Sequence, residues 1–95
     1  MEIVFEWDEA KAAANFAKHG VSFDEAKSVF ADALAAIFDD DEHSVHELRE
    51  LLIGHSVLDR LLVVSFTERG NGSIRIITAR KATRRERKDY EEGTG

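Results

Sequence analysis

The hydrophobic and polar positions of this chain follow two different periods, and each period predicts its own kind of element. Residues 2–7 alternate apolar and polar side chains, which indicates a short half-buried strand. Residues 8–18 are rich in alanine, with Ala12 and Phe16 on one helical face, and residues 23–31 repeat apolar side chains at helical spacing. The N-terminal third therefore predicts a strand followed by a helical hairpin that packs on a core.

Capping residues stand at the ends of both predicted helices. The Asp8 carboxylate can accept a free backbone amide of the first turn, and Gly20 tolerates the left-handed conformation at which helices end. Ser22 and Glu25 have the spacing of a capping box, in which each side chain accepts the other residue's backbone amide. These signals set the boundaries of the hairpin.

The C-terminal half is typical of strands. Three runs, residues 47–55, 61–67 and 73–80, are short and apolar enough to be strands, and residues 34–40 form a weaker candidate. The second and third runs are apolar on both faces, which favours central positions in a covered sheet. The Asn-Gly pair at 71–72 predicts a tight hairpin, because both residue types tolerate positive φ.

A final short helix completes the pattern. Thr83 and Glu86 form a second capping box, and the helix should end at Gly93. The predicted fold is α+β: an N-terminal strand and a helical hairpin packed on a small antiparallel sheet, with a short C-terminal helix.

Length and composition indicate one globular domain, residues 1–95. The chain is 43% hydrophobic and 34% charged, and it has no apolar stretch near the ~20 residues that span a bilayer. It has no cysteine, so disulfides, thiolate metal sites and cysteine nucleophiles are excluded. The first residues do not resemble a signal peptide, and we expect a cytoplasmic protein without membrane contact.

Charge changes this picture, because the net charge of −6 hides two unlike parts. Residues 69–88 carry eight cationic side chains and one anionic side chain, whereas residues 1–68 carry fifteen anionic and five cationic ones. The basic run predicts a surface that binds a polyanion such as nucleic acid. The alternative is that the basic run pairs with the acidic part inside the monomer.

Three arginines lie on or beside the predicted strands: Arg49, Arg69 at a strand end, and Arg80. Alternation along the last strand places Arg80 on the face of Ile74 and Ile76. A guanidinium among apolar side chains needs an anion, and guanidinium groups bind phosphate through two parallel hydrogen bonds. The arginines therefore predict a phosphate site, unless the fold's own carboxylates neutralise each of them.

Other side chains have both a structural and a chemical interpretation. His19 at a helix end either caps the helix or transfers protons near neutral pH. His43 and His46 lack a well-placed third ligand, so no metal site is predicted. Trp7 precedes a cap and favours packing, whereas Tyr90 lies on a polar helix and is a candidate for stacking on a base.

Several motifs then combine over residues 5–90. They are Phe5-Glu6-Trp7-Asp8 with Lys11 and Asn15, the segment Lys18 to Ala26, Arg49 with Ile53-Gly54, the segment Ile74 to Thr83, and Glu86 with Tyr90. Together they resemble the BrnT family of toxins. The family's usual serine in the last strand is Thr78 here, and its Asp-Pro after the second helix is Asp32-Ala33.

The resemblance implies a RelE-like fold and a ribonuclease toxin of a type II toxin–antitoxin pair that inhibits translation. The implied partner is a BrnA-like ribbon-helix-helix antitoxin, and the complex would repress its own operon, contacting operator DNA only through the antitoxin. The implied substrate is RNA, namely mRNA that is free or on the ribosome. Cleavage would need neither metal nor cofactor, because the 2′-hydroxyl attacks the adjacent phosphate.

The resemblance also suggests roles for individual residues. Arg69 and Arg80 would stabilise the phosphate, and Lys18 or His19 would transfer the proton. The implied catalytic set is Lys18, His19, Arg69 and Arg80, and the implied RNA-binding set is Arg49, Lys81, Arg84 and Tyr90. The alternative function is a non-catalytic module that binds nucleic acid or protein through the basic C-terminal face.

Overall fold

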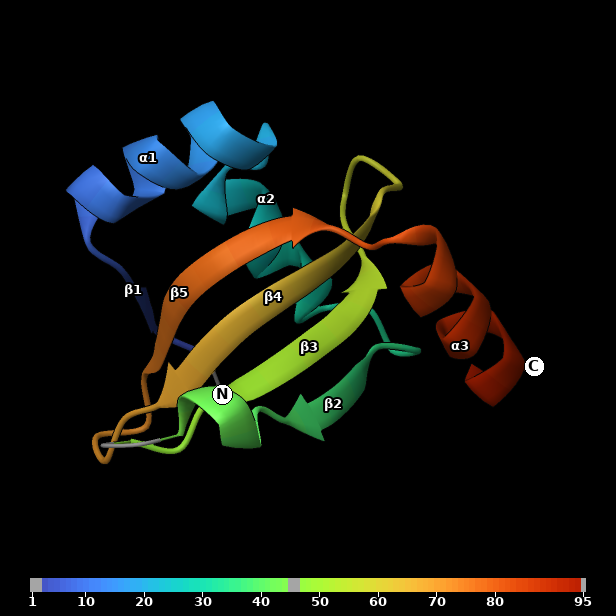
Figure 1. The fold of residues 1–95 in the computed structure, drawn as a ribbon. Coiled ribbons are helices and arrows are strands. Elements are labelled where there is room, and N and C mark those ends of the chain that lie inside the picture. Colours follow the sequence, from blue (N-terminus) through green and yellow to red (C-terminus); the bar gives the residue numbers. More distant parts are fainter. Residues whose placement is uncertain (1–2, 45–46, 95) are drawn as a thin grey trace.

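Five strands form one mixed sheet in the described part of the chain, residues 3–44 and 47–94 of a computed structural model (Figure 1). The elements in order are β1 (Phe5–Glu6), α1 (Glu9–His19), α2 (Phe23–Val29), β2 (Ala36–Asp39), the 3-10 turn η1 (Asp41–His43), β3 (Glu50–His55), β4 (Leu61–Glu68), β5 (Ile74–Lys81) and α3 (Arg84–Thr94). The strand order is β1-β5-β4-β3-β2. The α+β class is confirmed, but β1 pairs with β5 in parallel, so the expectation of an antiparallel sheet was wrong at this edge.

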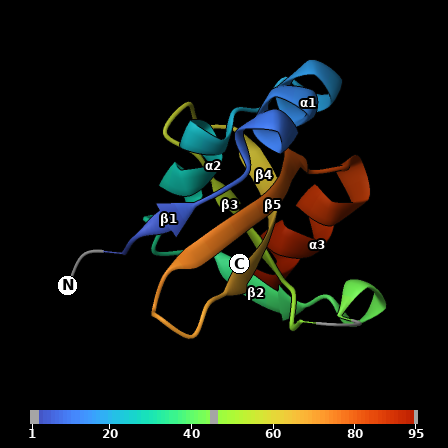
Figure 2. The same ribbon diagram turned by 90° about the vertical axis from the view of Figure 1, so that its left-hand side faces the viewer.

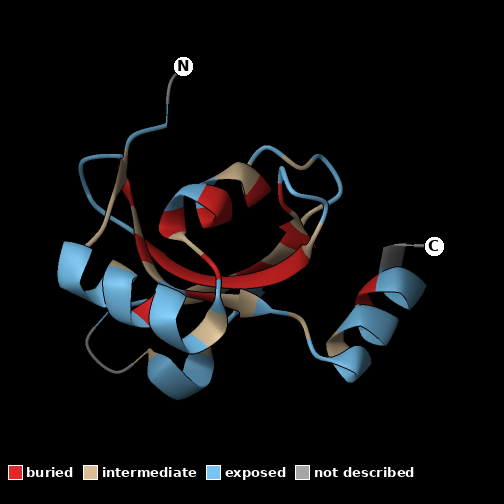
Figure 3. Ribbon diagram, turned by 90° about the horizontal axis from the view of Figure 1, so that it is seen from above, coloured by how far each residue is buried: buried red, intermediate tan, exposed pale blue. Residues whose placement is uncertain are grey.

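Helix α2 covers one face of the sheet and buries the core. Its apolar residues meet the inward side chains of the strands, and Figure 3 shows α2 in the curve of the buried strands. Figure 2 shows α2 on one side of the sheet and α3 on the other.

The face of the sheet opposite α2 is toward the viewer in Figure 1. It carries Leu51, Val63 and Ile77 and is bordered by α1, η1 and α3. We call it the open face.

The predicted caps of α1 are confirmed. The Asp8 carboxylate accepts the Lys11 amide at 3.0 Å, and Gly20 ends the helix with φ of 68°. The expected apolar face is only half right, since Ala12 is half-buried but Phe16 is 56% exposed. Asn15 is the buried residue of α1, so the helix turns a polar side chain toward the sheet and leaves Phe16 in solvent.

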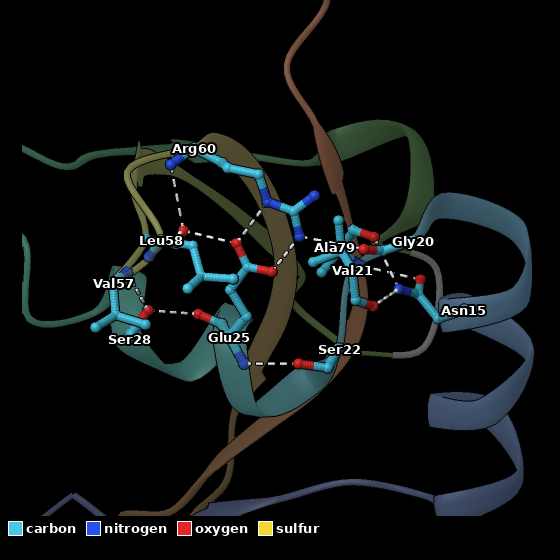
Figure 4. Close-up of polar contacts among 11 residues, drawn as sticks. Asn15, Gly20, Val21, Ser22, Glu25, Ser28, Val57, Leu58, Arg60 and Ala79 are labelled. Atoms are coloured by element: carbon cyan, nitrogen blue, oxygen red, sulfur yellow. Dashed lines mark hydrogen bonds and ion pairs between the residues drawn. The ribbon is translucent and has the colours of Figure 1, made fainter.

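The first capping box forms in one direction only. Ser22 accepts the Glu25 amide at 3.0 Å, as predicted. The Glu25 carboxylate does not reach back, because it is buried beneath Arg60 and accepts from the Arg60 guanidinium and from Ser56 at 2.7 Å (Figure 4). The Arg60 contact is the main cause that lowers the pKa of Glu25. An internal ion pair therefore takes the place of the second cap.

The second capping box is complete. Glu86 accepts the Thr83 amide at 2.8 Å, and Thr83 Oγ accepts the Glu86 amide at 3.1 Å. The helix continues through Gly93 to Thr94, so the predicted end at Gly93 was wrong.

None of the helices in the described residues has the length and apolar character that a bilayer crossing requires.

A β-bulge in β5 changes the direction of every side chain after it. Ser65 pairs with Thr78, but the next residue, Phe66, pairs with Ile76, so Ile77 is an extra residue on β5. Alternation therefore slips by one, and Ala79 rather than Arg80 enters the core. The prediction that Arg80 shares a face with Ile74 and Ile76 was wrong, because the bulge moves Arg80 to the open face.

Candidate functional site

Two adjoining hollows occupy the open face, and three residues line both: Arg49, Ile77 and Thr78. The first, which we call the lysine hollow, has a volume of about 360 Å³ and is completed by α1 through Lys11, Ala14, Asn15, Lys18 and His19. The second, the arginine hollow, has a volume of about 280 Å³ and is completed chiefly by Asp40, Glu42, His43, Ser65 and Arg80. Arg49 therefore stands between them.

Asn15 fixes α1 against the sheet edge. Its amide donates to the carbonyls of Val21 at 3.0 Å and Ala79 at 2.8 Å, and its carbonyl accepts the Ala79 amide at 3.1 Å (Figure 4). Strand β1 ends at Glu6, so it does not reach Ala79 on the outer edge of β5. The Asn15 side chain pairs with both backbone groups there, as a neighbouring strand would.

This anchor sets the direction of the α1 cations. Lys11, Lys18 and His19 lie four, three and four residues from Asn15, so they share its helical face. The lysine hollow thus contains Lys11, Lys18 and Arg49, with His19 beside them, and none of the described residues that line it is a carboxylate. Three permanent positive charges without a carboxylate between them favour an anionic ligand.

Arg49 keeps a guanidinium donor that the fold leaves unsatisfied. Its Nε is buried and makes no hydrogen bond within the described residues. The nearest carboxylate oxygen, Oε1 of Glu47, lies 3.6 Å from Nε, beyond hydrogen-bond distance, and both side chains are about one-third exposed. Nε itself is covered, but the terminal nitrogens of Arg49 also make no hydrogen bond in the described residues. Because the side chain is one-third exposed, a ligand phosphate in either hollow can reach these terminal nitrogens.

Arg80 is held but not saturated. Its two terminal nitrogens contact Glu86 at 2.7 and 2.9 Å, and Nη1 also donates to the Lys81 carbonyl at 3.3 Å. This ion pair lowers the pKa of Glu86 to about 2 and raises the pKa of Arg80. Three of five guanidinium donors are used within the described residues, so two remain for a ligand.

Arg69 lies outside both hollows. Its Nε contacts Glu6 at 3.1 Å and its Nη1 lies 3.8 Å from Glu47. Glu47 therefore stands between Arg69 and Arg49, with one oxygen toward each. The structure brings Lys18, His19, Arg49 and Arg80 to one face and keeps Arg69 at its border. Each of the three arginines also has an internal carboxylate within 4 Å, as the alternative interpretation predicted, and the Arg49 pair is beyond hydrogen-bond distance.

The remaining predicted RNA-binding residues lie elsewhere. Lys81 pairs with Leu62 on the α2 side of the sheet, near Glu25. Arg84 lies on the outer surface of α3, in a separate shallow hollow with Arg85 and Lys88.

Tyr90 is buried rather than exposed. Its hydroxyl donates to the Leu34 carbonyl at 3.0 Å, and its ring meets His55 edge to face at 5.9 Å between centroids. The ring is 7% exposed, so it offers no free face to a base. The structure contradicts the stacking role, and Tyr90 instead docks α3 on the segment before β2.

The sequence did not mark Lys11 and Thr78 as residues that line a hollow, nor Asn15 as the residue that anchors α1 to the sheet. The helical spacing of Lys11 and Lys18 was a usable signal, whereas nothing in the sequence marks the bulge beside Thr78. The described residues contain no group of three or more His, Asp or Glu side chains placed to hold a metal. His46 lies outside the described residues.

The chain is similar to known proteins in sequence and in fold. A family model described as "Ribonuclease toxin, BrnT, of type II toxin-antitoxin system" matches residues 7–86. Among solved structures, the 1.1 Å crystal structure of the Brucella abortus ribonuclease toxin BrnT is similar, with a TM-score of 0.68 and 25% sequence identity. The match covers 87% of this chain and 100% of that one. No curated protein matches the chain.

Proposed function

The chain belongs to the BrnT family of ribonuclease toxins of type II toxin–antitoxin systems, and from this premise we propose that the open face is where it cleaves RNA. The single observation that carries the proposal is Arg49, which lines both hollows and whose guanidinium makes no hydrogen bond in the described residues. A phosphodiester bound beside Arg49 would accept hydrogen bonds from its exposed terminal nitrogens and would lie between Lys18 and Arg80.

Cleavage of RNA by its own 2′-oxygen can be promoted by cationic and proton-transferring side chains such as those of the two hollows. The ribose 2′-oxygen attacks phosphorus, the P–O5′ bond breaks, and negative charge accumulates on the non-bridging oxygens. Arg49 and Arg80 would stabilise that charge from the sheet, and Lys11 and Lys18 from the helix. Lys18 or His19 would deliver a proton to the departing 5′-oxygen. Arg69 would act only indirectly, by sharing Glu47 with Arg49.

Membership of a type II family implies an antitoxin partner. We propose that a BrnA-like ribbon-helix-helix antitoxin neutralises the toxin, that the complex represses its own operon, and that the free toxin inhibits translation by cutting mRNA in the cytoplasm. We propose further that cleavage is independent of metal. The support for metal independence is the charge of the lysine hollow, where three fixed cations already stand where a metal would neutralise phosphate.

The test is cleavage of a short end-labelled RNA by the purified protein, with and without a chelator. We expect cleavage that the chelator leaves unchanged, and a loss of about 10²-fold or more in Arg49→Ala, as for removal of one oxyanion donor. Arg87→Ala on α3 is the matched control, because it removes an exposed cation outside both hollows. Equal loss in both variants, or intact cleavage in Arg49→Ala, would refute the assignment.

A second function has its own observation. Arg84, Arg85 and Lys88 line a hollow of about 540 Å³ on α3 together with Asp89 and Glu92. The excess of cations over carboxylates there supports a non-catalytic contact with nucleic acid or an acidic protein. Under this alternative the protein binds RNA tightly and leaves it intact. Binding that depends on Arg85 and not on Arg49 would favour it.

A further inference from the structure

Asp40 and His43 form a hydrogen-bonded pair inside the arginine hollow. Both carboxylate oxygens of Asp40 lie 3.1 Å from Nδ1 of His43. The Asp40 side chain is 13% exposed and the His43 side chain 59%, so the carboxylate is largely enclosed and the imidazole reaches solvent. An ionised carboxylate only accepts hydrogen bonds, so Nδ1 donates, and neutral His43 keeps its lone pair on Nε2.

Ser44 holds this pair in a fixed relation to Arg49. The Ser44 hydroxyl donates to the Asp40 carbonyl at 2.7 Å and accepts the Arg49 amide at 3.0 Å. The Asp40 amide in turn donates to the Arg49 carbonyl at 2.9 Å. Two of these hydrogen bonds join the turn that carries His43 to Arg49, the residue before β3, and the third closes the turn on itself.

We propose that His43, oriented by Asp40, is the general base of the cleavage reaction, an inference that rests on the proposed function. Neutral Nε2 takes the proton of the 2′-hydroxyl while the O2′–P bond forms and the P–O5′ bond breaks. The 5′-oxygen takes a proton from the acid of the lysine hollow, Lys18 or His19, and the products are a 2′,3′-cyclic phosphate and a 5′-hydroxyl. His43 then returns its proton to water. Asp40 is a positioning residue, since it acts only through the imidazole.

The surroundings of His43 fit a base that acts on a bound phosphodiester. Glu42 and Asp40 are the acids that line its hollow, and Arg49 and Arg80 are the cations. The arginines attract the phosphate that brings the 2′-hydroxyl to the imidazole. His43 would act from the arginine hollow and Lys18 or His19 from the lysine hollow, on opposite sides of Arg49. An in-line displacement requires this separation, because the attacking and leaving oxygens lie on opposite sides of phosphorus.

The experiment compares His43→Gln, Asp40→Asn and His19→Gln with the unaltered protein, in cleavage of RNA and of a nucleoside 3′-(p-nitrophenyl phosphate). The p-nitrophenolate leaves without a proton, so this substrate needs a base and no acid. We expect His43→Gln to lose about 10²–10⁴-fold in kcat on both substrates. We also expect the variant to lose the fall in rate on the acid side of the pH–rate profile, because that fall reports protonation of the base. His43 is exposed, so the variant should keep the thermal midpoint of the unaltered protein.

Asp40→Asn should lower kcat with little change in KM, because it disturbs the imidazole and no phosphate contact. His19→Gln tests whether His19 is the acid. An acid is needed for RNA and not for the nitrophenyl ester, so a variant that is slow on RNA alone has lost the acid. The inference is overturned if His43→Gln stays within threefold on both substrates with an unchanged pH profile, while Arg49→Ala is inactive. Absence of RNA cleavage by the unaltered protein would overturn the proposed function itself, and the two failures are therefore distinguishable.

Discussion

Arg80 and Glu86 meet through two parallel hydrogen bonds, from Nη1 to Oε1 at 2.7 Å and from Nη2 to Oε2 at 2.9 Å. The same carboxylate accepts the Thr83 amide and caps α3. One side chain therefore holds a site arginine in place and starts the C-terminal helix. It leaves two guanidinium donors for substrate, so the pair orients Arg80 without removing it from the open face.

The Glu86 ion pair should make stability depend on pH in the acid range. The folded pKa of Glu86 is lowered to about 2 from 4.5. A lowered carboxyl pKa stabilises the fold fully above the unfolded value, and this contribution is lost as pH falls from about 5 toward 2. We expect Glu86→Gln to cost about 1–2 kcal/mol at pH 6, because partial exposure screens the pair. Urea unfolding should show the difference shrinking toward pH 2; a constant difference would contradict the ion-pair explanation.

Asn15→Ala should destabilise the chain and disorder the lysine hollow. It removes the partner of both backbone groups of Ala79, and each unsatisfied buried group costs about 1–3 kcal/mol. Denaturant unfolding measures the loss, with Ala17→Ser on the exposed face of α1 as the control. RNA cleavage should fall as well, since Lys11 and Lys18 depend on this anchor. An unchanged midpoint would show that α1 is held by other contacts.

Gly54→Ala tests how closely β3 approaches the segment after α2. A methyl group at residue 54 would lie 2.8 Å from the Ala35 Cβ and 3.0 Å from Oδ2 of Asp32. Asp32 cannot easily move, because it accepts the amides of Leu34 and His55. We expect a loss of about 1–3 kcal/mol from overpacking. Gly70→Ala, where the added methyl meets nothing within 4 Å, should be nearly neutral.

Arg60 should matter for stability and not for cleavage. Its guanidinium pairs with buried Glu25 and donates to the Gly20 carbonyl at 3.1 Å (Figure 4). Arg60→Ala leaves a buried carboxylate unpaired, and we expect a loss of roughly 2–4 kcal/mol. At a temperature where the variant is folded, its cleavage rate should match the unaltered protein. A lower rate in the folded variant would place Arg60 in the site.

The sequence was sufficient where a local rule governs the structure. Asp8, Gly20 and the Thr83 to Glu86 box were predicted because caps depend on a few neighbouring residues. The bulge at Ile77 was not, since it reflects pairing between β4 and β5 rather than any local preference. The sequence predicted only the Ser22 capping box for Glu25, and the tertiary fold brought Arg60 to its carboxylate instead.

The candidate site shows the same limit. The charge pattern drew attention to residues 69–88, yet three of the four cations of the two hollows, Lys11, Lys18 and Arg49, come from the acidic part of the chain. Only Arg80 belongs to the basic run. A count along the sequence weighs all charges equally, whereas the fold decides which of them meet. The burial of Tyr90 likewise depends on a contact 56 residues away.

The most direct measurement is where RNA binds. A short oligonucleotide with 2′-O-methyl riboses cannot be cleaved by 2′-oxygen attack, so it can be titrated into the isotope-labelled protein and followed by backbone amide shifts. We expect the shifts to be gathered on the open face, at Lys18, Arg49 and Thr78. Shifts confined to α3, around Arg85 and Lys88, with the open face unchanged, would contradict this expectation.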